Sequence, residues 1–403
     1  MRPVVLGLTT LLLPAALAAQ PYSKPPSELT SYWEEPAFKD HPYKGPEKAK
    51  GALFWSHGLS GNAAQWQFPP PDVIRDMARD GWDVVKVQRN PLHENTWDRS
   101  GPKHVADLVA RVEKAKAAGY RQIIAAGQSY GGAISLEAAA RTGAITAVYA
   151  AAPGHGSDGC SSTPGAYTGR FWSLPELLEQ VIRKVQAARL AVLMADGDEC
   201  MAQAKPHEPI RRGLDASPAT NVLFLDQSMA VRGHGAGNTS QFRAWYGACL
   251  REFLDTSKPL IVREIRCTAP NPPPRFFWPA NVDTALLTAV DTAGLTGAWS
   301  GAMRSEPADN EWGRVVCTLV EKEEAGELQS VVSFDAGSER KLGMSVSRRV
   351  LKKNGAQWAY TTENSQYALR YTFRPEQGTG LLKITSANGS REWTAELKRG
   401  CPT

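Results

Sequence analysis

The feature that most limits the fold of this chain is a regular alternation of apolar runs and helix-like segments between residues 51 and 256. Short apolar runs bounded by turn residues are typical of buried strands. Because parallel neighbours in a sheet need crossover connections, the alternation predicts a parallel sheet wrapped by helices. The expected strands are residues 51–56, 83–87, 122–126, 145–151, 190–195 and 221–225, and the expected helices are residues 105–118, 130–142 and 240–254.

A different pattern begins near residue 290. Short alternating runs such as VVCTLV, YALRYTF and EWTAELK recur roughly every 10 to 15 residues, with turn residues between them. They predict a small antiparallel all-β domain over residues 290–403, either a sandwich or a barrel. The proline-dense residues 267–289 predict a linker between this domain and an α/β domain over residues 20–266. Residues 154–189 interrupt the α/β alternation and are expected to form a lid or a decorated crossover.

The N-terminal residues 1–19 have the features of a secretory signal peptide: a charged start at Arg2, an apolar stretch, and a small-residue cleavage site at Ala16-Leu17-Ala18. No later apolar run is long enough to span a bilayer, so we expect no membrane span after cleavage. The formal charge of the 403-residue chain is +5, with Lys and Arg scattered among Asp and Glu. This argues against a nucleic-acid partner, and the expected location is secreted or periplasmic.

An exported chain with six cysteines is expected to contain disulfides, although six allow 15 pairings. Cys160 and Cys200 each follow a strand end on one edge of the predicted sheet, on strands that should be neighbours, so we predict a bond between them. For the remaining four we favour Cys249–Cys267 and Cys317–Cys401, with a buried free thiol as the alternative for Cys249. No CxxC motif is present, which leaves zinc and thioredoxin-type sites without support.

Glycines crowd Ser129 in the stretch AAGQSYGGAIS, between an expected strand and an expected helix. A nucleophilic serine on a strained strand-to-helix turn needs small residues two before and two after it, because strand and helix pass each other there. Gly127 and Gly131 meet this demand, and Gly132 adds room. A phosphate loop is less favoured, since neither GxxxxGK[ST] nor GxGxxG occurs, and a tight turn without chemistry is the other alternative.

A serine nucleophile needs a base, and the base needs an orienting acid. Asp198 follows the expected strand 190–195 and should emerge at the same edge as Ser129; Asp196 and a solvated Asp-Gly turn are the alternatives. His234 lies on a glycine-flanked loop after the last expected strand, a place where a histidine is often only exposed to solvent. The order Ser129, Asp198, His234 is the order expected of nucleophile, acid and base on such a sheet.

Two backbone N–H groups are expected to stabilise an oxyanion, those of Tyr130 and of Leu59 in the loop SHGLSG. We expect His57 in that loop to be a structural residue bonded to the backbone. Gln128 and Tyr130 flank Ser129 and are predicted to form the wall of a substrate pocket. Residues 88–101 should reach the same rim, either as a polar loop with one anchoring tryptophan or with side chains that contact substrate, namely Arg89, His93, Glu94 and Trp97.

The motifs WSHGLSG, GQSYGG, ADGDE and RGHGAG, in this order, make residues 50–256 resemble the α/β-hydrolase superfamily. The serine elbow is similar to those of dienelactone-hydrolase-like esterases and prolyl-oligopeptidase-like serine peptidases. Dienelactone hydrolases proper carry a cysteine nucleophile, where this chain has Ser129, and no β-propeller precedes the core. In the β domain, Gly297-Ala298-Trp299 resembles the start of lipocalin-like barrels, and we expect this tryptophan to fill a core.

The resemblance implies acyl transfer to water without metal or organic cofactor. His234 would take the proton of Ser129, Ser129 would attack a carbonyl, and Asp198 would hold the imidazole tautomer. The implied substrate is a small-molecule or polymer carboxylic ester. A peptidase or amidase with the same triad, and a binding protein on an inactive hydrolase scaffold, are the alternatives. The sequence leaves the oligomeric state open.

Overall fold

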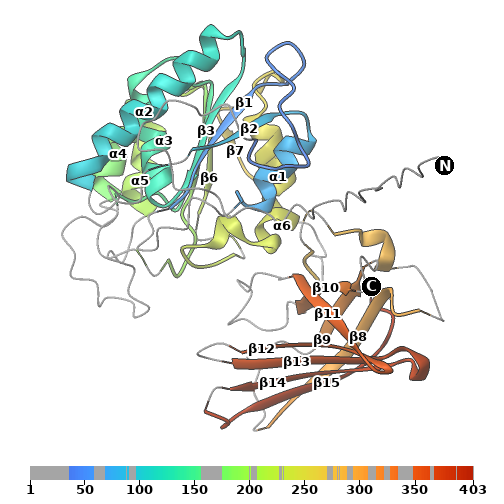
Figure 1. Ribbon diagram of the computed structural model, residues 1–403. Helices are drawn as coiled ribbons and strands as arrows, with labels where there is room; N and C mark the ends of the chain where they lie inside the picture. The colour runs from blue at the N-terminus through green and yellow to red at the C-terminus, as the bar shows by residue number, and fades with distance from the viewer. Residues whose placement is uncertain are drawn as a thin grey trace, which may run out of the picture.

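The computed structural model describes two folded regions, a parallel sheet with helices and an antiparallel barrel (Figure 1). The description covers residues 36–58, 69–87, 89, 97–155, 175–198, 200, 207–226, 229, 231–269, 276–278, 280, 282–287, 294–306, 315–321, 327–334, 348–363, 367–386 and 388–402. Of residues 97–100, 306, 348, 362, 363 and 367 it covers the backbone alone. The predicted signal peptide and much of the 154–189 segment lie outside these residues. Among them, no helix combines the length and apolarity needed to cross a bilayer.

The first region is a seven-stranded parallel sheet with the strand order β2-β1-β3-β4-β5-β6-β7. Its strands are short, and all but the edge strand β7 carry mostly apolar, buried side chains, as expected for a sheet covered on both faces. They are β1 (Ala52–Ser56), β2 (Asp83–Val87), β3 (Ile123–Gln128), β4 (Ala147–Ala151), β5 (Arg189–Leu193), β6 (Asn221–Leu225) and β7 (Glu264–Ile265).

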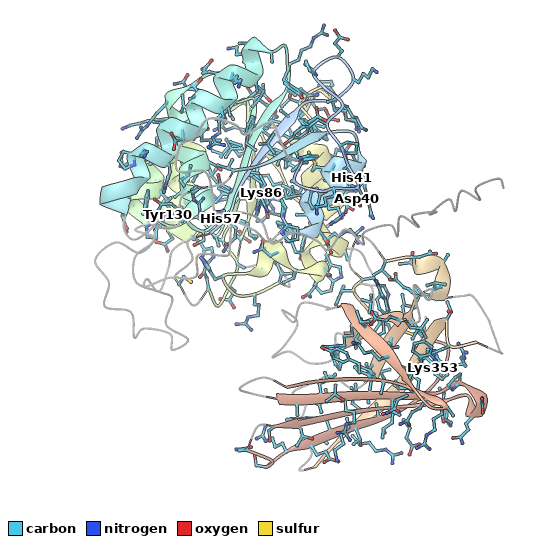
Figure 2. The ribbon with its side chains drawn as sticks, in the orientation of Figure 1. Asp40, His41, His57, Lys86, Tyr130 and Lys353 are labelled. Carbon is cyan, nitrogen blue, oxygen red and sulfur yellow. A yellow bond between two sulfur atoms is a disulfide. The ribbon has the colours of Figure 1, made fainter. Side chains whose placement is uncertain are left out.

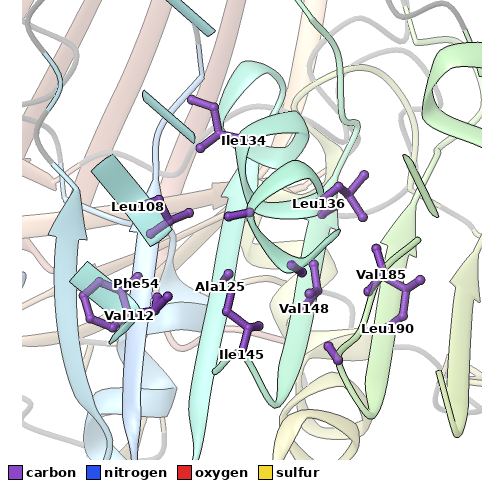
Figure 3. Packing of buried hydrophobic residues seen from close by; sticks show 14 of the residues in the cluster. Phe54, Leu108, Val112, Ala125, Ile134, Leu136, Ile145, Val148, Val185 and Leu190 are labelled. Carbon is purple, nitrogen blue, oxygen red and sulfur yellow. The ribbon is translucent and has the colours of Figure 1, made fainter. Parts of the chain in front are cut away.

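Helices pack on both faces of this sheet, because side chains alternate between the faces along each strand. One apolar cluster joins Phe54 of β1 and Ala125 of β3 to the first group of helices (Figure 3). A second cluster joins the opposite-facing Leu53 and Trp55 to the second group. The first group is α2 (Trp97–Ala117), α3 (Tyr130–Arg141), α4 (Pro175–Ile182) and α5 (His207–Asp215), and the second is α1 (Asp72–Arg79) and α6 (Ser240–Leu254).

Four central strands end together at one edge of the sheet. Their Cα partners form a continuous row in which Gln128, Ala151, Leu193 and Leu225 lie side by side on β3, β4, β5 and β6. The loops that leave these strands therefore begin at the same level. In doubly wound and related α/β sheets, ligands bind at this carboxyl edge.

The second region is a closed barrel of eight antiparallel strands in which each strand pairs with the next and β15 returns to β8. This closure identifies the all-β domain as a barrel, one of the two predicted forms. Trp299 is fully buried inside it, and its indole N–H donates to the Leu295 carbonyl at 2.9 Å, so it fills a core as expected. The strands are β8 (Gly297–Glu306), β9 (Val315–Val320), β10 (Glu327–Phe334), β11 (Arg348–Asn354), β12 (Gln357–Glu363), β13 (Tyr367–Arg374), β14 (Thr379–Ser386) and β15 (Glu392–Arg399).

Phe276, Phe277 and Trp278 connect the two regions, and we refer to these three residues as the strap. The ring of Phe277 packs edge-on against Trp245 of α6 at 5.5 Å between centroids. Its N–H donates to the hydroxyl of Ser333 on β10 at 3.0 Å. Phe276 and Trp278 belong to an apolar cluster on the barrel that includes Leu319 of β9. Alternate residues of the strap thus pack on different regions.

Two of the predicted disulfides are present. Cys249 of α6 bonds Cys267, which follows β7, and Cys317 of β9 bonds Cys401 beyond the last strand. Both pairings agree with the sequence prediction, and the free-thiol alternative for Cys249 is wrong. Disulfides of this kind fit a protein that folds in an oxidising compartment.

Candidate active site

Ser129 lies at the turn between β3 and α3, at the carboxyl edge of the sheet. Its backbone has φ 54° and ψ −121°, a conformation that residues other than glycine rarely adopt. Two hydrogen bonds hold the turn: the Ser129 N–H donates to the Ala151 carbonyl at 2.8 Å, and the Gly154 N–H donates to the Ser129 carbonyl at 3.0 Å. The strained serine is therefore fixed from both sides by the residues at and after the end of β4.

At two of the glycines around Ser129 a Cβ atom would collide with backbone, and at the third it would fit tightly. At Gly127 it would meet the backbone of Gly131, and at Gly131 it would meet the carbonyl oxygens of Ser56 and His57. At Gly132 it would lie 3.2 Å from Pro153, which follows β4. The clearance inferred from the sequence is thus a physical requirement of this turn.

Asp198 and His234 form a close pair on the loops that follow β5 and β6. His234 Nδ1 lies 3.0 Å from Asp198 Oδ1 and 3.1 Å from Oδ2. The side chains of His234 and Asp198 are 12% and 3% exposed, and Asp198 Oδ1 also accepts the Cys200 N–H at 2.8 Å. A buried carboxylate fixed in this way can hold one tautomer of an imidazole.

Asp196, the alternative acid, points elsewhere. Its carboxylate forms an exposed ion pair with Arg232 at 2.6 Å, and its backbone pairs with Arg232 in an isolated bridge. Gly197 and Gly233 adopt positive φ angles of 64° and 86°, which turn the two chains so that the residues after them meet. The bridge and these turns bring Asp198, rather than Asp196, against the histidine.

Gln128 connects the Asp198–His234 pair to the nucleophile turn. It directly precedes Ser129 and donates its Nε2 to the His234 carbonyl at 3.3 Å. It also packs against the loop after β1, where a Cβ atom on Gly58 would lie 2.5 Å from Gln128 Oε1 and 3.3 Å from Ser129 Cβ. Gln128 is 8% exposed and ties three loops together, and its place in a pocket wall stays a prediction.

Tyr130 provides the first N–H of α3, while Leu59, predicted as the second oxyanion donor, lies outside the described residues. The side chain of Tyr130 has no exposed surface, and its hydroxyl lies 3.1 Å from His104 Nδ1. The predicted contact of Tyr130 with substrate therefore remains a prediction. In the structure its ring is packed in the protein interior. Figure 2 shows Tyr130 and His57 together at one end of the sheet.

Arg89, expected at the rim as a possible contact of the substrate, is buried, with 2% exposure. Its Nη2 donates to the carbonyls of His57 and Gly58, and its guanidinium lies over the Tyr130 ring at 5.1 Å. Burial and the nearby Arg89 charge hold the pKa of His57 well below its ordinary value, so this histidine is neutral. These contacts fit the structural role expected of His57. His93 and Glu94 lie outside the described residues, as does the side chain of Trp97.

Cys200 is disulfide-bonded, but its predicted partner Cys160 lies outside the described residues, so that pairing stays a prediction. Within the described ranges, Asp198, Cys200 and His234 are the residues whose ligand atoms could surround a metal, within 4.8 Å of one another. A disulfide sulfur is not a thiolate ligand, and Asp198 already holds Nδ1 of His234. The cluster therefore fits an acid–base pair better than a metal centre.

The sequence alone did not indicate several features of this region. The rim segment expected as a loop over residues 88–101 enters α2 at Trp97, with Pro102 inside the helix. No signal in the sequence separated Arg89 from other polar rim residues. Its position directly after β2, the neighbour of β1, could have suggested a contact with the loop after β1.

No family model and no curated protein matches this sequence. Solved structures show a low-scoring likeness over about half of the chain. An esterase of Pyrococcus furiosus is 14% identical with a TM-score of 0.38, covering 52% of this chain and 83% of that one. A carbohydrate esterase from gut microbiota is 16% identical with a TM-score of 0.37, covering 52% and 87%. The esterase domain of a Rhodothermus marinus protein is 19% identical with a TM-score of 0.34, covering 52% and 88%.

These scores carry no conclusion about activity. The order of strands and helices does describe the fold by itself: a parallel sheet with a serine elbow after β3 and polar loops after β5 and β6. This arrangement is α/β-hydrolase-like, as the sequence motifs predicted, and the closed eight-stranded barrel follows it along the chain.

Proposed function

We propose that this protein is an exported serine hydrolase that cleaves carboxylic esters through Ser129, His234 and Asp198. The observation that carries the proposal is the contact of His234 with the buried Asp198 carboxylate at 3.0 Å, beside the strained turn that presents Ser129. A buried carboxylate against Nδ1 is the arrangement that prepares a histidine to accept a proton at Nε2. A strained serine flanked by obligatory glycines is the usual form of a nucleophile on this type of sheet.

In the proposed reaction, His234 removes the hydroxyl proton of Ser129 as the oxygen attacks the ester carbonyl. The oxyanion that forms is stabilised by the N–H groups of Leu59 and Tyr130. His234 then protonates the departing alcohol, leaving an acyl group on Ser129. A water molecule, deprotonated by His234, releases the carboxylic acid and restores the serine.

Export belongs to the same proposal. The first 19 residues are expected to be removed as a signal peptide, and the two disulfides described above suit an oxidising compartment. N-terminal sequencing of the protein from the medium or periplasm should begin at Ala19 or Gln20. A cytoplasmic protein that keeps residues 1–19 would contradict export, but it would leave the proposed ester hydrolysis untested.

The test is hydrolysis of p-nitrophenyl acyl esters by the wild type and by a matched pair of acid variants. Asp198→Asn should lower kcat by about three to four orders of magnitude, because an amide no longer fixes the required tautomer. Asp196→Asn removes only an exposed ion pair with Arg232 and should change kcat less than about twofold.

Equal effects of the two acid variants, or no effect of Asp198→Asn, would contradict the proposed acid. Peptide p-nitroanilides, assayed in parallel, distinguish an esterase from a peptidase. If the anilides are cleaved faster than the esters at equal concentration, the proposed substrate is an amide and not an ester. A folded wild type that cleaves neither substrate would point to the binding-protein alternative.

A further inference from the structure

A buried arginine lies under the loop that faces the nucleophile. Arg89 is the first described residue after β2, and its side chain runs beneath the loop that leaves the neighbouring strand β1. A charged guanidinium with 2% exposure is uncommon, because burial of a charge is unfavourable unless its N–H groups are satisfied. The groups that satisfy it are therefore informative.

One nitrogen of Arg89 binds two successive carbonyls of that loop. Nη2 donates to the His57 carbonyl at 2.6 Å and to the Gly58 carbonyl at 3.0 Å. The same nitrogen also lies 3.0 Å from His57 Nδ1, so three polar atoms lie within reach of its two protons. His57 Nδ1 lies 2.8 Å from the Gly58 carbonyl, and its tautomer decides whether it donates to that carbonyl or accepts from the guanidinium. In either tautomer the Gly58 carbonyl has the guanidinium beside it as a donor.

The same guanidinium contacts the other side of the site. Its Cζ lies 5.1 Å from the centre of the Tyr130 ring, within the range of a cation–π interaction. Tyr130 is the first residue of α3, directly after Ser129, and its ring is held at the far end by His104. Arg89 is therefore in contact with both segments that carry the predicted oxyanion donors.

We infer that Arg89 is a positioning residue of the oxyanion site, fixing and polarising the peptide group after Gly58 relative to Tyr130. This inference rests on the proposed function, since it assigns a role within the same reaction. The Gly58 carbonyl belongs to the planar peptide group whose N–H is the predicted donor of residue 59. Hydrogen bonds to a peptide carbonyl strengthen the donor on its opposite side.

The geometry explains why an arginine suits this role. The planar guanidinium binds two carbonyls from one edge while its face lies against an aromatic ring. A lysine ammonium is a point charge that has no face to stack, so it can satisfy the carbonyls only by giving up the contact with Tyr130. The burial of Arg89 and its bonds to the His57 and Gly58 carbonyls fit a role through this loop rather than direct contact with substrate.

Arg189 is a matched control. It is 3% exposed and also donates to backbone carbonyls, those of Phe253 at 2.6 Å and Asp255 at 2.8 Å. However, it is the first residue of β5, at the amino edge of the sheet and opposite the candidate site. Substitution of either arginine removes buried hydrogen bonds to backbone carbonyls, but only those of Arg89 lie at the candidate site.

The experiment measures ester hydrolysis and inhibition by an aryl trifluoromethyl ketone for wild type, Arg89→Lys, Arg89→Met and Arg189→Lys, with the melting temperature of each. The ketone adds to the serine as an oxyanion and so reports on the oxyanion site. Arg89→Lys should lower kcat by about 10- to 100-fold, somewhat less than loss of a donor, with KM within about twofold. The Ki of the ketone should rise by the same factor as kcat falls.

Arg189→Lys should lower the melting temperature to a similar extent while kcat and Ki stay within about twofold of the wild type. If Arg89→Met does not fold, Arg89→Lys alone gives the comparison. A folded Arg89→Lys that keeps the wild-type kcat and Ki would overturn the inference while leaving the proposed function intact. A wild type that neither hydrolyses esters nor binds the ketone would overturn the proposed function and, with it, the inference.

Discussion

Ser129 is held in a strained backbone conformation by close packing of the segments on either side of it. Gly131 is the tightest of these contacts, because a Cβ there would meet the carbonyl oxygens of Ser56 and His57 at the end of β1. Neither strand β1 nor helix α3 can move away without separating the sheet from its helix. The strained conformation of Ser129 is therefore held by the packing of backbone segments.

Gly131→Ala should lower the free energy of unfolding by about 3 kcal/mol, since the new methyl group overpacks a site bounded by backbone atoms. Gly143→Ala is the control, because a Cβ there would lie 3.6 Å from the Gln186 side chain, an ordinary contact. Urea unfolding measures both. If the Gly131→Ala protein is as stable as Gly143→Ala, then β1 and α3 can move apart with little loss of stability.

The buried side chain of His155 should make the free energy of unfolding depend on pH. Burial lowers its pKa from 6.5 to about 4. Between these values the unfolded chain binds a proton that the folded chain does not, so the free energy of unfolding falls as the pH drops from about 6.5 to about 4. From pH 7 to pH 4.5 the wild type should lose about 2 kcal/mol more than His155→Gln, by urea unfolding at each pH. The same loss in both proteins would show that His155 is not the group responsible.

The sequence indicated candidate site residues, but it did not indicate their surroundings. Ser129, Asp198 and His234 could be named because each follows a strand and each has a chemically distinctive side chain. The contacts of Arg89 and the Tyr130 ring could not be predicted, because they depend on which carbonyls and rings lie beside them in space. Burial of a charged side chain leaves no periodic signal in a sequence.

At the level of secondary structure, most apolar segments were predicted closely and short helices rich in charged residues were not. The expected strands 83–87 and 221–225 agree with β2 and β6, and the expected helix 240–254 agrees with α6. Helices α1 and α5, of 8 and 9 residues, were missed, because each carries a single narrow apolar stripe among charged residues.

The two disulfides should differ in their effect on stability. Their sequence separations are 18 for Cys249–Cys267 and 84 for Cys317–Cys401. From the chain entropy of the unfolded state, these loops correspond to about 3 and about 4.5 kcal/mol. Chemical denaturation of Cys249→Ala/Cys267→Ala and of Cys317→Ala/Cys401→Ala should show the larger loss in the barrel. Equal losses, or a larger loss in the α/β region, would contradict this ranking.

For the whole molecule, alternating hydrophobicity could not distinguish a sandwich from a barrel. Both forms have one buried and one outward face on every strand, and only the pairing of β15 with β8 decides between them. The proline-rich segment was expected to be a linker. The strap within it instead buries three aromatic side chains, each no more than 9% exposed, against the two regions that it connects.

Because alternate residues of the strap pack on different regions, their substitution should destabilise different regions. Phe277→Ala should destabilise the α/β region by about 3 kcal/mol, because the ring packs on Trp245 in the core beside α6. Trp278→Ala should instead destabilise the barrel, where that ring packs with Phe276. Hydrogen exchange followed by mass spectrometry locates each loss. Faster exchange in the same region for both variants would show that the strap does not divide its contacts in this way.

The central claim is that Ser129 is a nucleophile activated by His234, and covalent labelling with a fluorophosphonate tests it most directly. Peptide mapping of the labelled wild type should place the adduct on Ser129. Labelling should be absent from Ser129→Ala and slower by at least about 100-fold in His234→Ala. A folded wild type that is not labelled, an adduct on another residue, or a His234→Ala protein labelled at the wild-type rate would contradict the account.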